Sequence, residues 1–166
     1  MGAGDLYARI EPVLSTEYHY WLQRGSLEVE TGDIRKAENF LGAARSLGGE
    51  DYRVGTAYSY MLMRKAWEAP KDLHAEEYLQ EGMKELEQII EDWGHKSHYP
   101  YHVLGSQGLA WAHRGIARKE QRREFIEGLE KVVEAGLVNH PGEETLTHLR
   151  DSLKKEILLT AVADKS

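Results

Sequence analysis

The 166-residue sequence contains no cysteine, and this absence excludes disulfide bonds, thiolate metal sites and a cysteine nucleophile. It has no apolar run of 18 residues, and its N-terminus lacks the charged-then-apolar pattern of a signal peptide. Neither GxxxxGK[ST] nor GxGxxG occurs, so no loop is predicted to cradle nucleotide phosphates. We therefore expect a cytoplasmic protein that is neither membrane-bound nor built around a nucleotide.

Proline is also scarce, with 4 residues, and alternating runs of Val, Ile and Thr are missing, which argues against a β-sheet. Apolar residues make up 41% of the chain and charged residues 30%, a composition that suits a helical domain. The net charge of −7 disfavours nonspecific binding to nucleic acid or to an anionic membrane.

What the sequence does contain is one pattern that occurs three times. Each occurrence begins with Tyr, has a small residue at its eighth position and has another at its fifteenth. The starts at positions 18 and 52 are 34 residues apart, and the third start follows after 49 residues. The stretches are Tyr18–Gly32, Tyr52–Ala66 and Tyr101–Gly115; the small residues are Gly25, Ser59 and Gly108, then Gly32, Ala66 and Gly115.

Close packing of two helices explains this spacing. A small residue at the eighth position lets a second helix approach, and a glycine at the fifteenth can adopt the left-handed conformation that ends a helix. In the first unit Asp33 then supplies a helix N-cap, and a narrow apolar stripe follows it at Ala37, Leu41 and Ala44.

The apolar spacing and the Gly and Pro boundaries predict about eight helices. They are Asp5–Ile10, Ser15–Thr31, Asp33–Leu47, Asp51–Glu68, Asp72–Trp93, Tyr101–Gly115, Glu120–Leu137 and Glu143–Val162.

These residues resemble the tetratricopeptide repeat, which has a 34-residue period and two helices per unit. The first unit places Trp21, Gly25, Ala37, Leu41 and Ala44 at positions of the motif, and the third places Leu104, Gly108 and Trp111. The resemblance implies an all-α, antiparallel helix-hairpin array of about three repeats over residues 18–141. Residues 1–17 would form a short helix and lead-in, and residues 142–166 a C-terminal capping helix and tail. The alternative is an irregular α-bundle without true repeats.

A second, more general resemblance is to the helical-repeat tails of large bacterial multidomain proteins, which follow a nucleotide-hydrolysing or sirtuin-like domain. The short helix Asp5–Ile10 also makes a poor N-terminal cap. We therefore expect either that the chain is part of a longer protein or that its N-terminal face docks on a partner. The second resemblance implies a sensing or assembly role, with the chemistry carried elsewhere.

The tetratricopeptide resemblance further implies a peptide-binding groove along the first helix of each unit. In the middle unit Arg53, Tyr60 and Arg64 share one helix face, and Met63 would add an apolar floor. We expect such a groove to bind a protein or peptide partner, in particular an acidic or C-terminal carboxylate segment, with His19, His102 and His113 as polar walls. The implied positions are His19, Leu22, Ser26, Val29 and Glu30; Arg53, Thr56, Tyr60, Met63 and Arg64; and His102, Gly105, Leu109, Ala112 and His113.

No catalytic, metal or cofactor site is predicted. The serines of the first helices have no strand-turn-helix elbow around them, and the many carboxylates fall on amphipathic helices where a solvated face is the default. His95, His98 and His102 are close in sequence, but Pro100 interrupts the helical face that a zinc site would need. The predicted function is a non-enzymatic scaffold.

The alternative function uses a basic segment in this acidic chain. Five cations lie close together between the helices of the third unit, as expected for a surface that contacts phosphates or an acidic partner. This segment predicts an RNA-binding or enzyme-accessory module, although no aromatic platform is interleaved with the charges. Its residues are Arg114, Arg118, Lys119, Arg122 and Arg123.

Overall fold

The computed structural model describes residues 18–165, with side chains up to residue 161, and this part of the chain is helical throughout, without strands. The predicted helix Asp5–Ile10 lies outside the described residues. The described part of the chain contains seven helices: α2 (Tyr18–Thr31), α3 (Ile34–Gly48), α4 (Tyr52–Glu68), α5 (Ala75–Trp93), α6 (Tyr99–Gly115), α7 (Lys119–Asn139) and α8 (Glu144–Lys165). No helix in residues 18–165 combines the length and hydropathy that crossing a bilayer requires.

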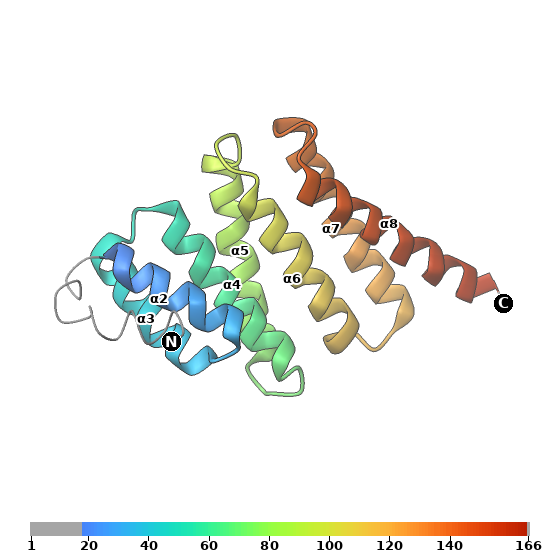
Figure 1. The fold of residues 1–166 in the computed structure, drawn as a ribbon. Helices are drawn as coiled ribbons and strands as arrows, with labels where there is room; N and C mark the ends of the chain where they lie inside the picture. Colours follow the sequence, from blue (N-terminus) through green and yellow to red (C-terminus); the bar gives the residue numbers. More distant parts are fainter. Residues whose placement is uncertain (1–17, 166) are drawn as a thin grey trace.

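Consecutive helices form three antiparallel hairpins, α2–α3, α4–α5 and α6–α7, as the sequence predicts (Figure 1). The first helix of each hairpin packs against the first helix of the next, so that α2, α4, α6 and α8 form one row. Helix α8 therefore takes the place that the first helix of a fourth hairpin would occupy, and it covers α6 and α7.

The core consists of three clusters in series, and each is shared by one hairpin and the helix that follows it. Val29, Leu41 and Met61 represent the cluster of α2, α3 and α4. Leu86 and Trp111 belong to the cluster of α4, α5 and α6. The last cluster joins α6 and α7 to α8 through Tyr101, Leu129, Val133, Leu146 and Leu153.

The small residues at the eighth positions lie at close helix approaches, which confirms that prediction. A Cβ at Gly25 would overlap the side chain of Leu41, and a Cβ at Gly108 would lie 2.6 Å from Leu129 Cδ2. In the middle hairpin the approach uses a glycine on the second helix, because a Cβ at Gly82 would lie 3.0 Å from the carbonyl oxygen of Ser59.

The small residue at the fifteenth position ends a helix by the expected mechanism only in the first unit. Gly32 has φ 91°, and the amides of Gly32 and Asp33 donate to the carbonyl oxygen of Glu28. Ala66 lies inside α4, which continues to Glu68. Gly115 is the last residue of α6 and has no positive φ, so its small size instead leaves room for the ring of Trp111.

The two tryptophans at motif positions differ in burial. Trp111 is buried in the middle cluster. Trp21 is only partly buried and stacks on Phe40 of α3, with ring centroids 5.6 Å apart.

Candidate functional site

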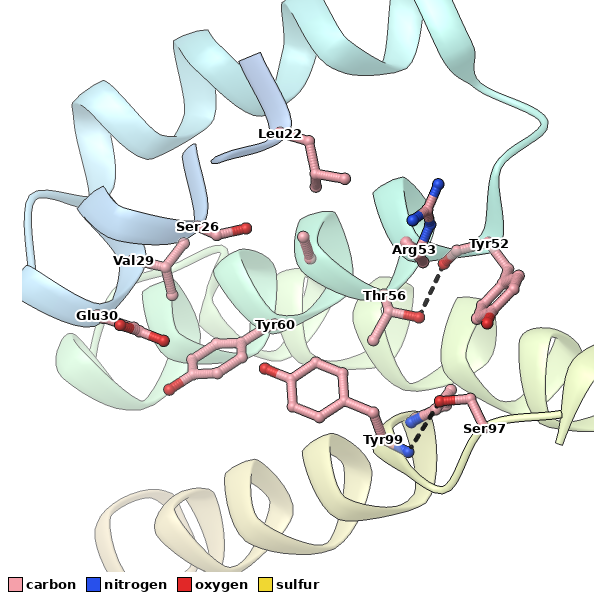
Figure 2. A pocket seen from close by; sticks show the side chains of 12 residues that line it. Leu22, Ser26, Val29, Glu30, Tyr52, Arg53, Thr56, Tyr60, Ser97 and Tyr99 are labelled. Carbon is pink, nitrogen blue, oxygen red and sulfur yellow. Dashed lines mark hydrogen bonds between the residues drawn. The ribbon is translucent and has the colours of Figure 1, made fainter. Parts of the chain in front are cut away.

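A cavity of about 330 Å³ lies where α2, α4 and the beginning of α6 meet (Figure 2). Helix α2 contributes four residues to its wall, α4 contributes five, and the remaining three come from the start of α6 and the loop before it. The lining residues are Leu22, Ser26, Val29 and Glu30; Tyr52, Arg53, Thr56, Ala57 and Tyr60; and Ser97, Tyr99 and Pro100.

Tyrosine rings form a large part of this wall. In Figure 2 the rings of Tyr60 and Tyr99 lie side by side, with the Tyr99 hydroxyl pointing toward Tyr60, and Glu30 lies next to Tyr60. Tyr99 as a residue is 45% exposed, but burial of its hydroxyl, followed by the nearby Tyr60 and Glu30, raises the pKa of that hydroxyl above its usual value. The surroundings of Tyr99 therefore disfavour negative charge.

The first turn of α6 holds Tyr99 in place. Pro100 stands at the beginning of the helix, where its missing N–H leaves no hydrogen bond unmade, and its fixed φ suits the helix. The amide of Tyr99 donates to Ser97 Oγ at 3.2 Å, a contact drawn in Figure 2. Both local features set the direction in which the Tyr99 ring enters the cavity.

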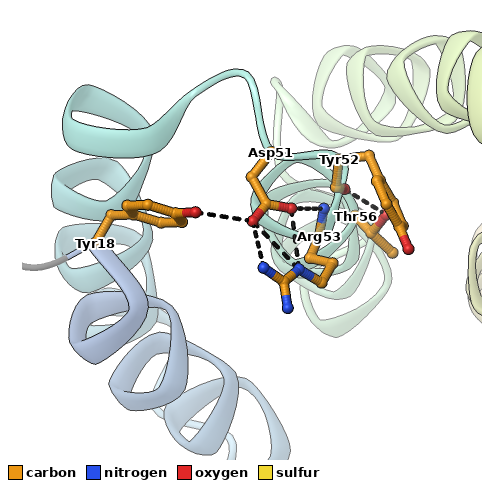
Figure 3. A network of polar contacts seen from close by, with 5 residues as sticks. All are labelled: Tyr18, Asp51, Tyr52, Arg53 and Thr56. Atoms are coloured by element: carbon orange, nitrogen blue, oxygen red, sulfur yellow. Dashed lines mark hydrogen bonds and ion pairs between the residues drawn. The ribbon is translucent and has the colours of Figure 1, made fainter.

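A compact polar network lies at the opposite end of the cavity, around Asp51 (Figure 3). Asp51 caps α4 by accepting a hydrogen bond from the Arg53 amide at 2.9 Å, and it also accepts one from the Tyr18 hydroxyl at 3.2 Å. The Arg53 guanidinium donates to both carboxylate oxygens, at 3.0 Å from Nε to Oδ1 and 2.6 Å from Nη2 to Oδ2. Arg53 holds the pKa of Asp51 at about 2, so the pair is ionised and its charges compensate each other.

Among the described residues, Glu30 is the only acidic one in the cavity wall. It is exposed, and within the described part of the chain its carboxylate has no ion pair. Since Arg53 is neutralised by Asp51, the uncompensated charge at the cavity is negative.

Seven of the fifteen positions implied by the resemblance line the cavity, but of the seven side chains expected to contact the partner directly only Arg53 and Tyr60 do so. Met63 is a correction: it is 0% exposed in the middle core cluster, because α5 approaches closely at Gly82 and covers it. Arg64 is a second correction, since it does not line the cavity. Its side chain, 19% exposed, donates to the carbonyl oxygen of Val29 at 2.5 Å and to Glu68 Oε1 at 2.8 Å.

None of the three histidines that were expected to line the groove contributes to the cavity wall. His19 is exposed beside Tyr18. His102 stacks behind Tyr99, with ring centroids 6.4 Å apart, and burial, followed by the nearby His98, lowers its pKa. His113 lies 3.6 Å from Glu156 of α8. Helix α8 thus covers the groove face of the third unit, where Gly105 and Ala112 are also buried.

Sequence reasoning missed five lining residues: Tyr52, Ala57, Ser97, Tyr99 and Pro100. The sequence predicts that the first helix of the third unit starts at Tyr101, whereas α6 begins at Tyr99. The missed signal is Pro100 itself, because proline is favoured in the first turn of a helix and so indicates a start before position 101.

The cations of the basic segment do not act together, because three of them make separate contacts with nearby residues. The Arg114 guanidinium lies 4.5 Å from the centroid of the Trp67 ring, Arg122 donates to the carbonyl oxygen of Ile116 at 3.0 and 3.1 Å, and Arg123 lies 3.9 Å from Glu127. Arg118 and Lys119 are exposed at the start of α7, and in the described residues neither side chain forms an ion pair. Of the five cations in the basic segment, these two are therefore the most accessible to a partner.

The histidines near Pro100 do not converge. His98 lies 3.6 Å from Glu143, whereas His102 stacks on Tyr99. Within the described residues no group of three or more His, Cys, Asp or Glu side chains could hold a metal ion together.

Comparison of the chain with models of known families, with curated proteins and with solved structures finds no match. The function is therefore inferred from the residues of the site and from their surroundings.

Proposed function

We propose that this protein is a non-catalytic helical-repeat scaffold of the tetratricopeptide type that binds a segment of a partner protein. The observation that carries the proposal is the cavity between α2, α4 and α6. Seven positions that the tetratricopeptide resemblance assigns to peptide binding line this one cavity: Leu22, Ser26, Val29, Glu30, Arg53, Thr56 and Tyr60.

The chemistry of the cavity supports a binding role. Its wall combines apolar side chains with tyrosines, serines and charged groups, the mixture by which a concave site holds an apolar group and fixes its orientation. Tyrosine is enriched at protein interfaces because it offers a large apolar ring together with a hydroxyl. A cavity of this size takes one or two side chains of a partner, with the rest of the segment lying along α2 and α4.

A peptide selection tests the proposal. Random peptides displayed on phage would be enriched on the wild-type protein, and the recurring sequences synthesised and titrated by fluorescence anisotropy. Ser26 is partly buried in the cavity wall, so Ser26→Phe should fill the cavity with a phenyl ring and weaken the selected peptides by about tenfold or more. We expect no such loss in the control Ser152→Phe, which makes the same change at an exposed position of α8.

Circular dichroism would show that both variants keep the helical fold. Recurring peptides that bind Ser26→Phe as tightly as wild type would place the binding site elsewhere, and Arg118 and Lys119 would then be the next surface to substitute. A selection that yields no recurring sequence would contradict a peptide-binding role for this part of the chain.

A further inference from the structure

The uncompensated charge of the cavity restricts what it can bind. Arg53 is paired with both oxygens of Asp51, and Arg64 is paired with Glu68 and donates to Val29, so the charge of each guanidinium is already compensated by a carboxylate. Glu30 has no ion pair in the described part of the chain. An acidic occupant would therefore meet repulsion from Glu30 without a matching cation, whereas a basic occupant would meet attraction.

The tyrosines strengthen the same preference. The face of an aromatic ring attracts a cation within about 6 Å of its centroid, and in Figure 2 the ring of Tyr60 lies next to Glu30 and that of Tyr99 lies next to Tyr60. Burial is the main cause of the raised pKa of the Tyr99 hydroxyl, and the smaller contribution from Glu30 agrees with a negative charge near this end of the cavity.

The remainder of the wall suits a long alkyl chain. Leu22, Val29 and Ala57 are apolar residues of the wall, and Figure 2 shows Val29 near Tyr60 and Glu30. Lysine and arginine carry a stem of methylene groups that packs on apolar surface while the charged head reaches a polar end.

We propose that the cavity receives a lysine or arginine side chain of the partner, with its stem against Leu22 and Val29 and its cationic head among Tyr60, Tyr99 and Glu30. This inference rests on the proposed function, since it names the residue that the binding cavity recognises. It replaces the carboxylate-bearing segment that the sequence alone suggests.

Three probes of equal chain length test the charge preference: n-pentylammonium, 1-pentanol and hexanoate. Each would be titrated into isotopically labelled protein at physiological ionic strength, and amide and side-chain shifts followed by NMR. We expect shifts concentrated at Glu30, Tyr60 and Tyr99, with pentylammonium binding about tenfold more tightly than pentanol and hexanoate binding most weakly.

Two variants separate the sources of the preference. Glu30→Gln removes the charge at an exposed position, and Tyr60→Leu keeps apolar volume but removes the ring face. Each variant should lower the affinity for pentylammonium several-fold, toward that for pentanol, and leave the affinity for pentanol nearly unchanged. The control Glu124→Gln changes the net charge equally on the exposed face of α7 and should have no effect.

The outcomes distinguish the inference from the proposed function. If pentanol binds at the cavity as tightly as pentylammonium, or hexanoate binds more tightly, the cation inference is wrong while the cavity remains a binding site. If no probe shifts the cavity residues, yet selected peptides lose affinity in Ser26→Phe, the side chain recognised is not cationic. If the probes fail and Ser26→Phe has no effect on peptides either, both proposals fail.

Discussion

At the scale of single residues, Asp51 joins two helices and fixes one charge. It caps α4, accepts a hydrogen bond from the Tyr18 hydroxyl of α2 and forms an ion pair with the Arg53 guanidinium. Arg53 looks like a free groove cation in the sequence because the Asp51 pairing depends on α4 beginning at Tyr52. The same local geometry that stabilises the helix thus compensates the charge of Arg53.

Replacing Asp51 should reveal this dual role. Asp51→Ala removes the cap and should lower the free energy of unfolding by about 1–2 kcal/mol, whereas Asp51→Asn retains a capping oxygen and should cost less. Denaturant unfolding followed by circular dichroism measures both values. An unchanged stability in Asp51→Ala would mean that the network of Figure 3 contributes nothing.

The pH dependence follows from the pKa of Asp51, which folding lowers from 3.8 to about 2. A carboxyl group with a lowered pKa stabilises the fold above its unfolded value and loses that contribution as pH falls through its folded value. Wild type should therefore exceed Asp51→Asn in stability by a constant amount above about pH 4, and the difference should shrink between about pH 4 and pH 2. Parallel unfolding curves over that range would contradict the assignment.

At the scale of helices, the sequence predicts the seven described elements well, because each is bounded by a Gly, Pro or Asp residue. The site is less predictable. Which neighbouring position faces inward depends on how a helix is rotated by its partners, and at Met63 the glycine of α5 at position 82 decides this. A motif that assigns groove positions by number cannot include that rotation, so it places Tyr60 correctly at the cavity wall and Met63 incorrectly.

A pair of glycine substitutions tests the close approach of α6 and α7. Gly108→Leu would force a side chain into Leu129, whose own side chain is buried, and overpacking of this kind costs about 1–3 kcal/mol or more. Gly128 lies on α7 with no atom within 4 Å of an added Cβ, so Gly128→Leu should be neutral or stabilise by up to about 1 kcal/mol through helix propensity. Thermal or denaturant unfolding compares the two, and equal effects would contradict the packing.

At the scale of the whole molecule, stability is distributed along a row of neighbouring helices. Each core cluster joins one hairpin to the next first helix, and α8 closes the last cluster with Leu146, Leu149 and Leu153. The candidate cavity lies toward the other end, over α2, α4 and the start of α6. In such an array, stability is approximately a sum of terms within units and between nearest neighbours.

A substitution in α8 should therefore have a local effect. Leu153 is fully buried, and Leu153→Ala should lower the free energy of unfolding by about 2–5 kcal/mol, whereas the control Leu159→Ala, at a position that is 57% exposed, should change it little. Native-state hydrogen exchange should show the loss of protection in α6, α7 and α8, with α2 and α3 much less affected, because only the last cluster loses a contact. Peptides selected on wild type should still bind Leu153→Ala, since the cavity residues belong to other helices or to the far end of α6. A uniform loss of protection in all described helices would instead indicate one cooperative core, and the row of separable units would be wrong.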